Sequence, residues 1–205
     1  MLVTFHIVLP NMAPMRCPTL EDNRVRLSPL DLSNYKHLFD IAKQENLIQY
    51  SPNTINTPEA LKIVVQKALD DYYHNTVIPF IIYDKQAQAY AGSSRYMNID
   101  SYNSVIEIGF TWIGREFQGT GLNKHMKFLM LQYAFETLKF DKVQLKTDER
   151  NLQSRKAIEK IGAVYEGTIR KNTLMPDGYK RNTCYYGILA EEWPAIKETV
   201  FTGFF

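Results

Sequence analysis

Hydrophobic and polar residues follow two different rhythms along the chain, and the change between them predicts the order of helices and strands. After a short apolar run near 25–30, apolar side chains up to about residue 73 recur every three or four residues, the spacing of helices that bury one face. We expect a strand near 25–30 and a helical stretch near 32–39. A clearer helix should begin at Pro58, because Thr57 suits the N-cap, Pro58 the first helical position and Glu59 the first turn.

From residue 77 the chain changes to short runs rich in β-branched and aromatic residues, separated by polar turns. These runs predict three consecutive antiparallel strands at 78–83, 89–97 and 104–113. Simple alternation divides the third strand into two faces, because successive side chains point to opposite sides. We expect Ile106, Ile108, Phe110 and Trp112 on one face, and Glu107, Gly109 and Thr111 on the other.

The second half of the chain alternates between helix and strand patterns. A helix near 122–138 is apolar nearly all round and should be largely buried. We further expect a strand at 143–147, a helix at 151–161 closed by Gly162, a hairpin of 164–170 and 181–189 around Asp177-Gly178, and a terminal helix near 191–193. The sum is an α/β domain with a mixed sheet flanked by helices.

Length and composition indicate one folded domain. The 205 residues show no repeat and no Gly/Ser linker, and 45% of them are hydrophobic. We assign 19–205 to a single domain and 1–18 to an N-terminal arm, for which an extra strand and a disordered segment are both open.

Charge and cysteine content narrow the function classes. Formal net charge is +2, which disfavours nucleic acid and membrane surfaces as partners. Cys17 and Cys184 form no CxxC and belong to no Cys/His cluster, so neither a disulfide framework nor a metal site is expected. The apolar start of the chain lacks a basic region and is too short to span a bilayer, so a cytoplasmic location is expected.

The turn between 113 and 122 is the strongest candidate for chemistry. Backbone N–H groups and the positive end of a helix dipole converge there, and Gly119 and Gly121 would let a phosphate approach closely. A tight strand-to-helix turn explains the glycines equally well. Neither a P-loop ending nor a G-x-G-x-x-G after the first strand is present, which argues against those two nucleotide sites.

The hexapeptide Gln118-Gly119-Thr120-Gly121-Leu122-Asn123 resembles the acetyl-CoA signature of GNAT N-acetyltransferases, Gln/Arg-x-x-Gly-x-Gly/Ala, with Asn123 departing at the last position. The segments that follow, 147–154, 157–163, 165–170 and Glu192-Trp193, are similar in order to the ribosomal-protein N-terminal (Rim-type) branch of that family. Asn182 stands where this branch often has Asp. The resemblance extends from Val25 to Trp193.

This resemblance implies the GNAT fold, with a sheet of roughly seven strands, and transfer of an acetyl group from acetyl-CoA to a primary amine. The acceptor would be a protein N-terminus or a small amine, reached by direct transfer in a ternary complex, without a metal. A catalytically silent acyl-CoA-binding or sensor module on the same fold is the alternative. Exposed strand edges in such folds can also pair into a homodimer.

The resemblance also assigns site residues. The cofactor-binding set is Thr111, Trp112, Ile113, Gln118, Gly119, Thr120, Gly121, Leu122, Asn123, Asn151 and Ser154. Asn151 would orient pantetheine amides, and it equally suits a helix N-cap.

Three residues are candidates for proton transfer. Glu107 could accept the ammonium proton of the acceptor, although a salt-bridged strand residue is the commoner role of Glu. Ser154 could donate a proton to the leaving thiolate or simply pack as a small residue. Tyr186 could place a phenol near the sulfur or serve as a core aromatic, and Tyr185 should face the other way.

Overall fold

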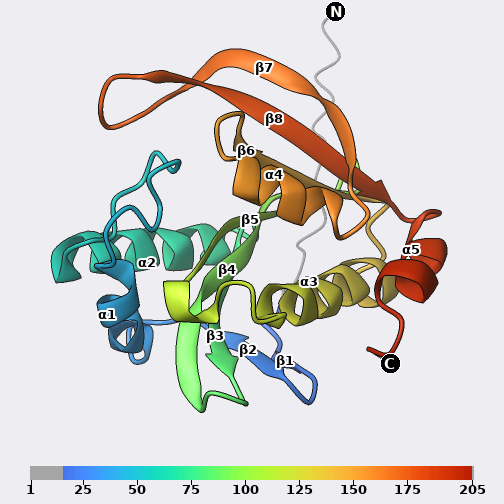
Figure 1. Ribbon diagram of the computed structural model, residues 1–205, viewed down its shortest axis with the longest axis horizontal. Coiled ribbons are helices and arrows are strands. Elements are labelled where there is room, and N and C mark those ends of the chain that lie inside the picture. The colour runs from blue at the N-terminus through green and yellow to red at the C-terminus, as the bar shows by residue number, and fades with distance from the viewer. Residues whose placement is uncertain (1–15, 205) are drawn as a thin grey trace, which may run out of the picture.

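The computed structural model describes residues 16–204 and shows one eight-stranded sheet (Figure 1). The strand order is β1-β2-β3-β4-β5-β6-β8-β7, and every neighbouring pair is antiparallel except β5–β6. The strands are β1 (Leu20–Glu21), β2 (Val25–Pro29), β3 (Ile78–Asp84), β4 (Ala89–Asp100), β5 (Val105–Ile113), β6 (Lys142–Asp148), β7 (Val164–Leu174) and β8 (Lys180–Leu189). The predicted mixed sheet is confirmed, with the two-residue β1 as an additional strand. The predictions for residues 1–15 lie outside the described residues.

The helices begin and end close to the predicted positions. They are α1 (Phe39–Ala42) after a 3₁₀ turn at Tyr35–Leu38, α2 (Pro58–Tyr73), α3 (Leu122–Gln132), α4 (Leu152–Glu159) and α5 (Trp193–Val200), with a π-helical turn Tyr133–Thr137 extending α3. The Thr57 hydroxyl accepts a hydrogen bond from the Ala60 N–H at 3.1 Å, so Thr57 caps α2 as predicted.

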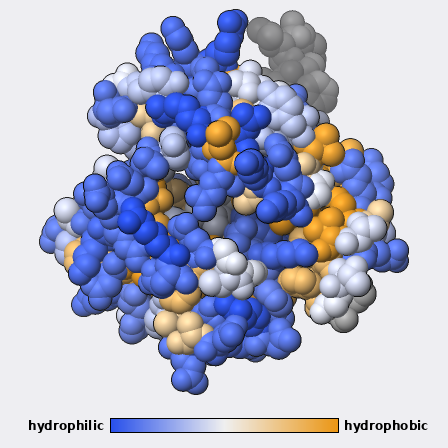
Figure 2. Space-filling view, viewed as in Figure 1, coloured by the Kyte–Doolittle hydropathy of each residue, from blue (hydrophilic) through white to orange (hydrophobic). Residues whose placement is uncertain are grey.

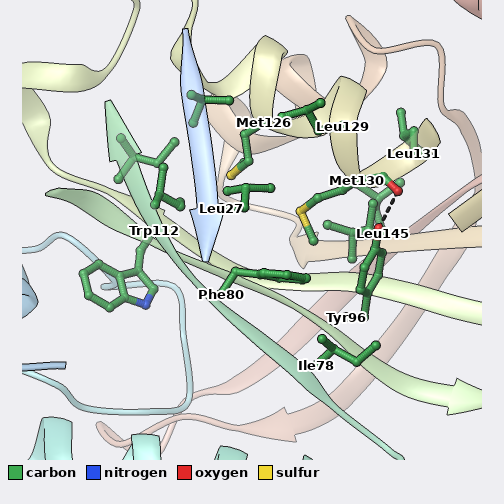
Figure 3. Close-up of a cluster of buried hydrophobic side chains, with 14 of the residues drawn as sticks. Leu27, Ile78, Phe80, Tyr96, Trp112, Met126, Leu129, Met130, Leu131 and Leu145 are labelled. Carbon is green, nitrogen blue, oxygen red and sulfur yellow. Dashed lines mark hydrogen bonds between the residues drawn. The ribbon is translucent and has the colours of Figure 1, made fainter. Parts of the chain in front are cut away.

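The core is formed by the sheet together with buried residues of α3 and α2. In Figure 1, α1 and α2 lie to the left of β4 and β5, and α3 and α5 lie to the right. The buried Tyr96 of β4 packs edge-on against Phe80 and donates its hydroxyl to the Met130 carbonyl of α3 (Figure 3). This contact fixes α3 against the face of the sheet that carries Tyr96.

A β-bulge in β5 overturns part of the predicted face assignment. Gly109 pairs with Arg95 and Trp112 with Ser93, so Phe110 and Thr111 together stand opposite a single residue of β4. Phe110 has a positive φ of 44°. An extra residue shifts the alternation by one position, and the prediction is therefore right up to Gly109 and wrong from Phe110 on.

Contacts of the bulge show where its side chains point. The Phe110 ring lies 4.4 Å from the Arg95 guanidinium, on the face that carries Glu107 and Gly109. The Thr111 hydroxyl turns the other way, toward α3, where it accepts a hydrogen bond from Lys127 at 2.9 Å. Phe110 and Thr111 thus face opposite sides of the sheet.

Candidate active site

Strands β5 and β6 separate soon after they begin to pair, and a cavity opens between them. Their parallel ladder joins only 105–107 to 142–144. Beyond it, residues 108–113 of β5 and 145–148 of β6 line a cavity of about 580 Å³. A hollow near the centre of the face in Figure 2 lies below the lobe formed by β7 and β8. The cavity size suits a cofactor-sized ligand.

The loop before α3 forms one end of this cavity. Gly119 and Gly121 have φ of +75° and +89°, a left-handed conformation that favours glycine, and a Cβ on either would meet no atom within 4 Å. The Gln118 side chain donates to the Ile113 carbonyl at 2.9 Å and accepts from Gln153 of α4 at 3.2 Å. The loop is therefore tied to both walls of the cavity.

The first turn of α3 begins without a side-chain cap at Gly121. N–H groups at a helix start need acceptors, and the helix dipole favours negative charge there. The neighbouring glycines leave open space beside this helix start, and helix starts of this kind commonly bind phosphate groups.

The structure brings together most of the residues predicted to bind a cofactor. Those lining the cavity are Thr111, Trp112, Ile113, Gln118, Gly119, Asn123, Asn151 and Ser154. Thr120, Gly121 and Leu122 are outside its described lining. Leu122 is buried in the core, and the Thr120 hydroxyl bonds the Phe117 carbonyl at 2.8 Å. Among these three, only backbone groups are candidates for contact with a ligand.

Glu107 is buried at the point where the strands separate. It is 4% exposed, and its Oε2 accepts a hydrogen bond from Asn98 at 2.7 Å and pairs with Lys146 Nζ at 2.8 Å. The salt bridge is therefore present, and the catalytic role of Glu107 stays a prediction. The other oxygen, Oε1, lies 3.0 Å from the position that a Cβ on Gly109 would take. Gly109 therefore leaves Oε1 room beside the bulge.

The three remaining candidates differ in their placement. Asn151 caps α4 by accepting from the Ser154 N–H at 3.0 Å, and both residues line the cavity. Tyr186 is buried outside the described lining. Its hydroxyl accepts from Arg155 at 3.0 Å and donates to Glu159 at 3.2 Å, and burial raises its pKa.

Tyr185 and Tyr186 face opposite ways as expected, but Tyr185 rather than Tyr186 lines the cavity. Tyr185 falls in phase with Arg181 and Thr183, which line the same cavity from β8.

Four cationic side chains line the cavity: Arg95, Lys127, Lys146 and Arg181. Two carboxylates face them, and both are engaged: Glu107 with Lys146, and Asp148 with Arg150 at 2.7 Å. Sequence reasoning did not single out any of these cations.

Lys127 is the most unusual of the four. It is 6% exposed, and burial lowers its pKa to about 7. The ion pairs found within residues 16–204 do not include it. The available signal was the position of Lys127 between Met126 and Phe128 in a helix predicted to be largely buried.

Other classes of site receive no support from the described residues. Within residues 16–204, no group of His, Cys, Asp and Glu could hold a metal ion. No helix in that same stretch is long and apolar enough to cross a membrane. Burial raises the pKa of the Cys17 thiol to about 12, and Cys184 is buried, so both thiols should be unreactive.

Comparisons with known proteins point to one family. The model of the acetyltransferase (GNAT) domain matches residues 24–164. The Bacillus subtilis protein "Putative ribosomal N-acetyltransferase YdaF" is 35% identical over 100 residues, which span 49% of this chain and 54% of that protein. A "Probable spermine N(1)-acetyltransferase" of Bacillus subtilis subsp. natto is 22% identical over 61% of this chain and 82% of its own length.

The fold of this chain also matches that of a solved acetyltransferase. The crystal structure of a GCN5-related N-acetyltransferase from Brucella melitensis superposes with a TM-score of 0.83 and 27% identity, covering 96% of this chain and 91% of that one. The match to YdaF covers about half the length of that relative.

Proposed function

The chain belongs to the GNAT family of acetyltransferases, and we propose that it transfers the acetyl group of acetyl-CoA to a primary amine by direct attack within a ternary complex. The observation that carries this proposal is the cavity between β5 and β6, with the start of α3 at one end and Glu107 at the other. The acceptor would be a protein N-terminus or a small amine. Two free cysteines fit a reducing, cytoplasmic location.

The donor would bind along the wall formed by β5. The N–H groups at 119–123 would hold the pyrophosphate, and Gln118 would keep that loop against both walls. The buried Trp112 Nε1 has no hydrogen-bond partner within the described chain, and it lines the cavity where the pantetheine arm would run. Acetyl-CoA supplies an activated thioester, and a backbone N–H of residues 110–113 would polarise its carbonyl.

Proton transfer would use two of the predicted residues. Glu107 Oε1 would accept a proton from the acceptor ammonium, directly or through water, which leaves a nucleophilic amine. Ser154, at the start of α4, would donate a proton to the departing thiolate. We leave Tyr186 out of this scheme because Arg155 and Glu159 occupy its hydroxyl.

Thermal unfolding with acetyl-CoA and a CoA-release assay test the proposal. Millimolar acetyl-CoA should raise the melting temperature, because a ligand that binds only the folded state stabilises it. With an amine that is turned over, Glu107→Gln should reduce kcat/KM by about 100-fold, the scale of general-base catalysis. Glu166→Gln, which alters a partly exposed ion pair with Lys142, is the matched control and should retain activity.

The silent binding module predicts a different outcome. Acetyl-CoA would still stabilise the protein, but no amine from a panel of peptide N-termini, polyamines and aminoglycosides would release CoA. That result would contradict acetyl transfer, and absence of any stabilisation would contradict both readings.

A further inference from the structure

Arg95 is a charged side chain of the cavity that the proposed reaction leaves unused. It lies on β4 opposite Gly109 and stacks over the Phe110 ring at 4.4 Å. Its Nε is buried and has no hydrogen-bond partner within residues 16–204, and the ion pairs found there do not include it. Burial lowers its pKa, against the opposing fields of Asp71 and Glu107.

A guanidinium in this position needs an acceptor from elsewhere. Its five N–H donors lie in one plane and match a carboxylate in two parallel hydrogen bonds. The Phe110 ring lies against the guanidinium, with 4.4 Å between Arg95 Cζ and the ring centroid. Two carboxylates act on Arg95, and both have other partners: Glu107 uses Oε2 to bind Asn98 and Lys146, and Asp71 pairs with Lys67. An unsatisfied buried donor costs free energy, so a ligand that supplies the missing acceptor gains affinity.

The position of Arg95 assigns this ligand to the acceptor side. Arg95, Glu107 and Gly109 share one face of the sheet, whereas Thr111 and Lys127 lie toward α3. Under the proposed function, on which this inference rests, the acceptor amine must reach Glu107. A second group of the same molecule then lies within reach of Arg95.

The charges that line the cavity indicate the charge of the acceptor group that lies near Arg95. Beside Glu107, the lining carries the cations Arg95, Lys146 and Arg181, and the two carboxylates of the lining are both engaged. A polycation would meet repulsion there, whereas an anionic group would be attracted.

We propose that Arg95 binds a carboxylate of the acceptor, so that the substrate is an amine with a carboxylate a few atoms from its nitrogen. Two sources share this chemistry: a free amino acid, and a peptide whose first residue is acidic. Polyamines are excluded as preferred acceptors.

Calorimetric titration of the CoA-saturated protein tests this without requiring turnover. Two matched pairs separate the sources: alanine against alaninamide, and Asp-Ala-Ala-amide against Asn-Ala-Ala-amide. The carboxylate-bearing member of one pair should bind at least 10-fold more tightly, since bidentate carboxylate pairing is charge-assisted. The pair that shows the preference identifies the source.

Variants assign the effect to Arg95. Arg95→Met keeps an unbranched side chain over Phe110 and should reduce the preference to below about 3-fold, while CoA affinity stays within about 2-fold. Arg95→Lys keeps the charge without the planar fork and should give an intermediate preference. Arg170→Met, at an exposed position of β7 outside the cavity, should bind like the unmodified protein.

Three outcomes would overturn the proposal. These are equal binding within both pairs, a preference that survives in Arg95→Met, and a kcat/KM for spermine above that of the carboxylate-bearing amines. Each of them leaves acetyl transfer itself intact. Failure of CoA to bind in the first titration would instead mark failure of the proposed function.

Discussion

The two edges of β6 differ in how completely their polar groups are paired. Toward β8, all seven residues of β6 have an antiparallel partner, whereas toward β5 the ladder ends after three. Within residues 16–204, the two buried side-chain nitrogens without a hydrogen bond are Arg95 Nε and Trp112 Nε1, and both line the cavity at the open edge. Buried polar groups are normally satisfied. The contrast indicates that the closed edge is complete by itself and that the open edge is completed by ligands.

Among the substitutions that test this contrast, removal of the buried charge of Lys127 should have the largest effect on the free energy of unfolding. Its pKa is about 7 in the folded chain, against an ordinary value of 10.5, so the folded state carries the cost of a buried ammonium below pH 7. Between these values the unfolded chain binds more protons, and stability rises with pH. Lys127→Met should therefore add about 3 to 5 kcal/mol to the free energy of unfolding at pH 6 and almost nothing above pH 10.

Urea unfolding at pH 6 and pH 10 measures this effect. Lys124→Met, on an exposed position of the same helix, is the control and should show no such pH dependence. A Lys127→Met protein that is less stable at pH 6 would show that the hydrogen bond to Thr111 outweighs the desolvation cost.

A substitution in the loop at the start of α3 should have a smaller effect on stability. Gly121→Ala forces a residue with a Cβ to keep a φ of +89°, at a cost of about 1 to 2 kcal/mol. Gly178→Ala carries the same strain in the β7–β8 turn, where φ is +81° and no atom lies within 4 Å of the added Cβ. Both should lose similar stability, but only Gly121→Ala should weaken acetyl-CoA binding in a thermal-shift titration. Equal affinity in the two variants would argue against a pyrophosphate site at this loop.

The sequence predicted the features that local chemistry controls. Thr57 and Asn151 cap their helices, and the turn at Asp177-Gly178 joins β7 to β8, because each depends on residues within a few positions. The bulge at Phe110 was missed because it depends on the register with β4, which alternation cannot reveal.

The surroundings of the cavity cations could not be predicted either, because they also depend on the tertiary structure. Arg95 stands in an ordinary strand pattern, and its isolation becomes visible only when Phe110 and Glu107 are placed around it. Local pattern therefore located the loop that we propose for acetyl-CoA, whereas the proposed acceptor side required the tertiary structure.

The helix caps Asn151 and Thr57 allow a comparison between a capping residue that lines the cavity and one that does not. Asn151→Ala and Thr57→Ala should each cost about 1 kcal/mol of stability, since each removes one side-chain acceptor from a helix start. Only Asn151 lines the cavity, so only its loss should also reduce acetyl-CoA affinity. Urea unfolding and calorimetric titration of both variants provide the measurement. An affinity loss in Thr57→Ala would show that helix stability, rather than contact with the ligand, controls binding.

The smallest effect is expected at the closed edge of β6. Lys142 pairs with Glu166 of β7 at 2.6 Å, with both side chains partly exposed. Such pairs contribute little, and Lys142→Ala should change the free energy of unfolding by at most about 0.5 kcal/mol. Acetyl-CoA affinity should stay unchanged, because seven backbone pairs with β8 hold β6 in place without this side chain. Calorimetric titration of Lys142→Ala would contradict this view if affinity fell, since the position of β6 beside the cavity would then depend on its surface charges as well as on its ladder.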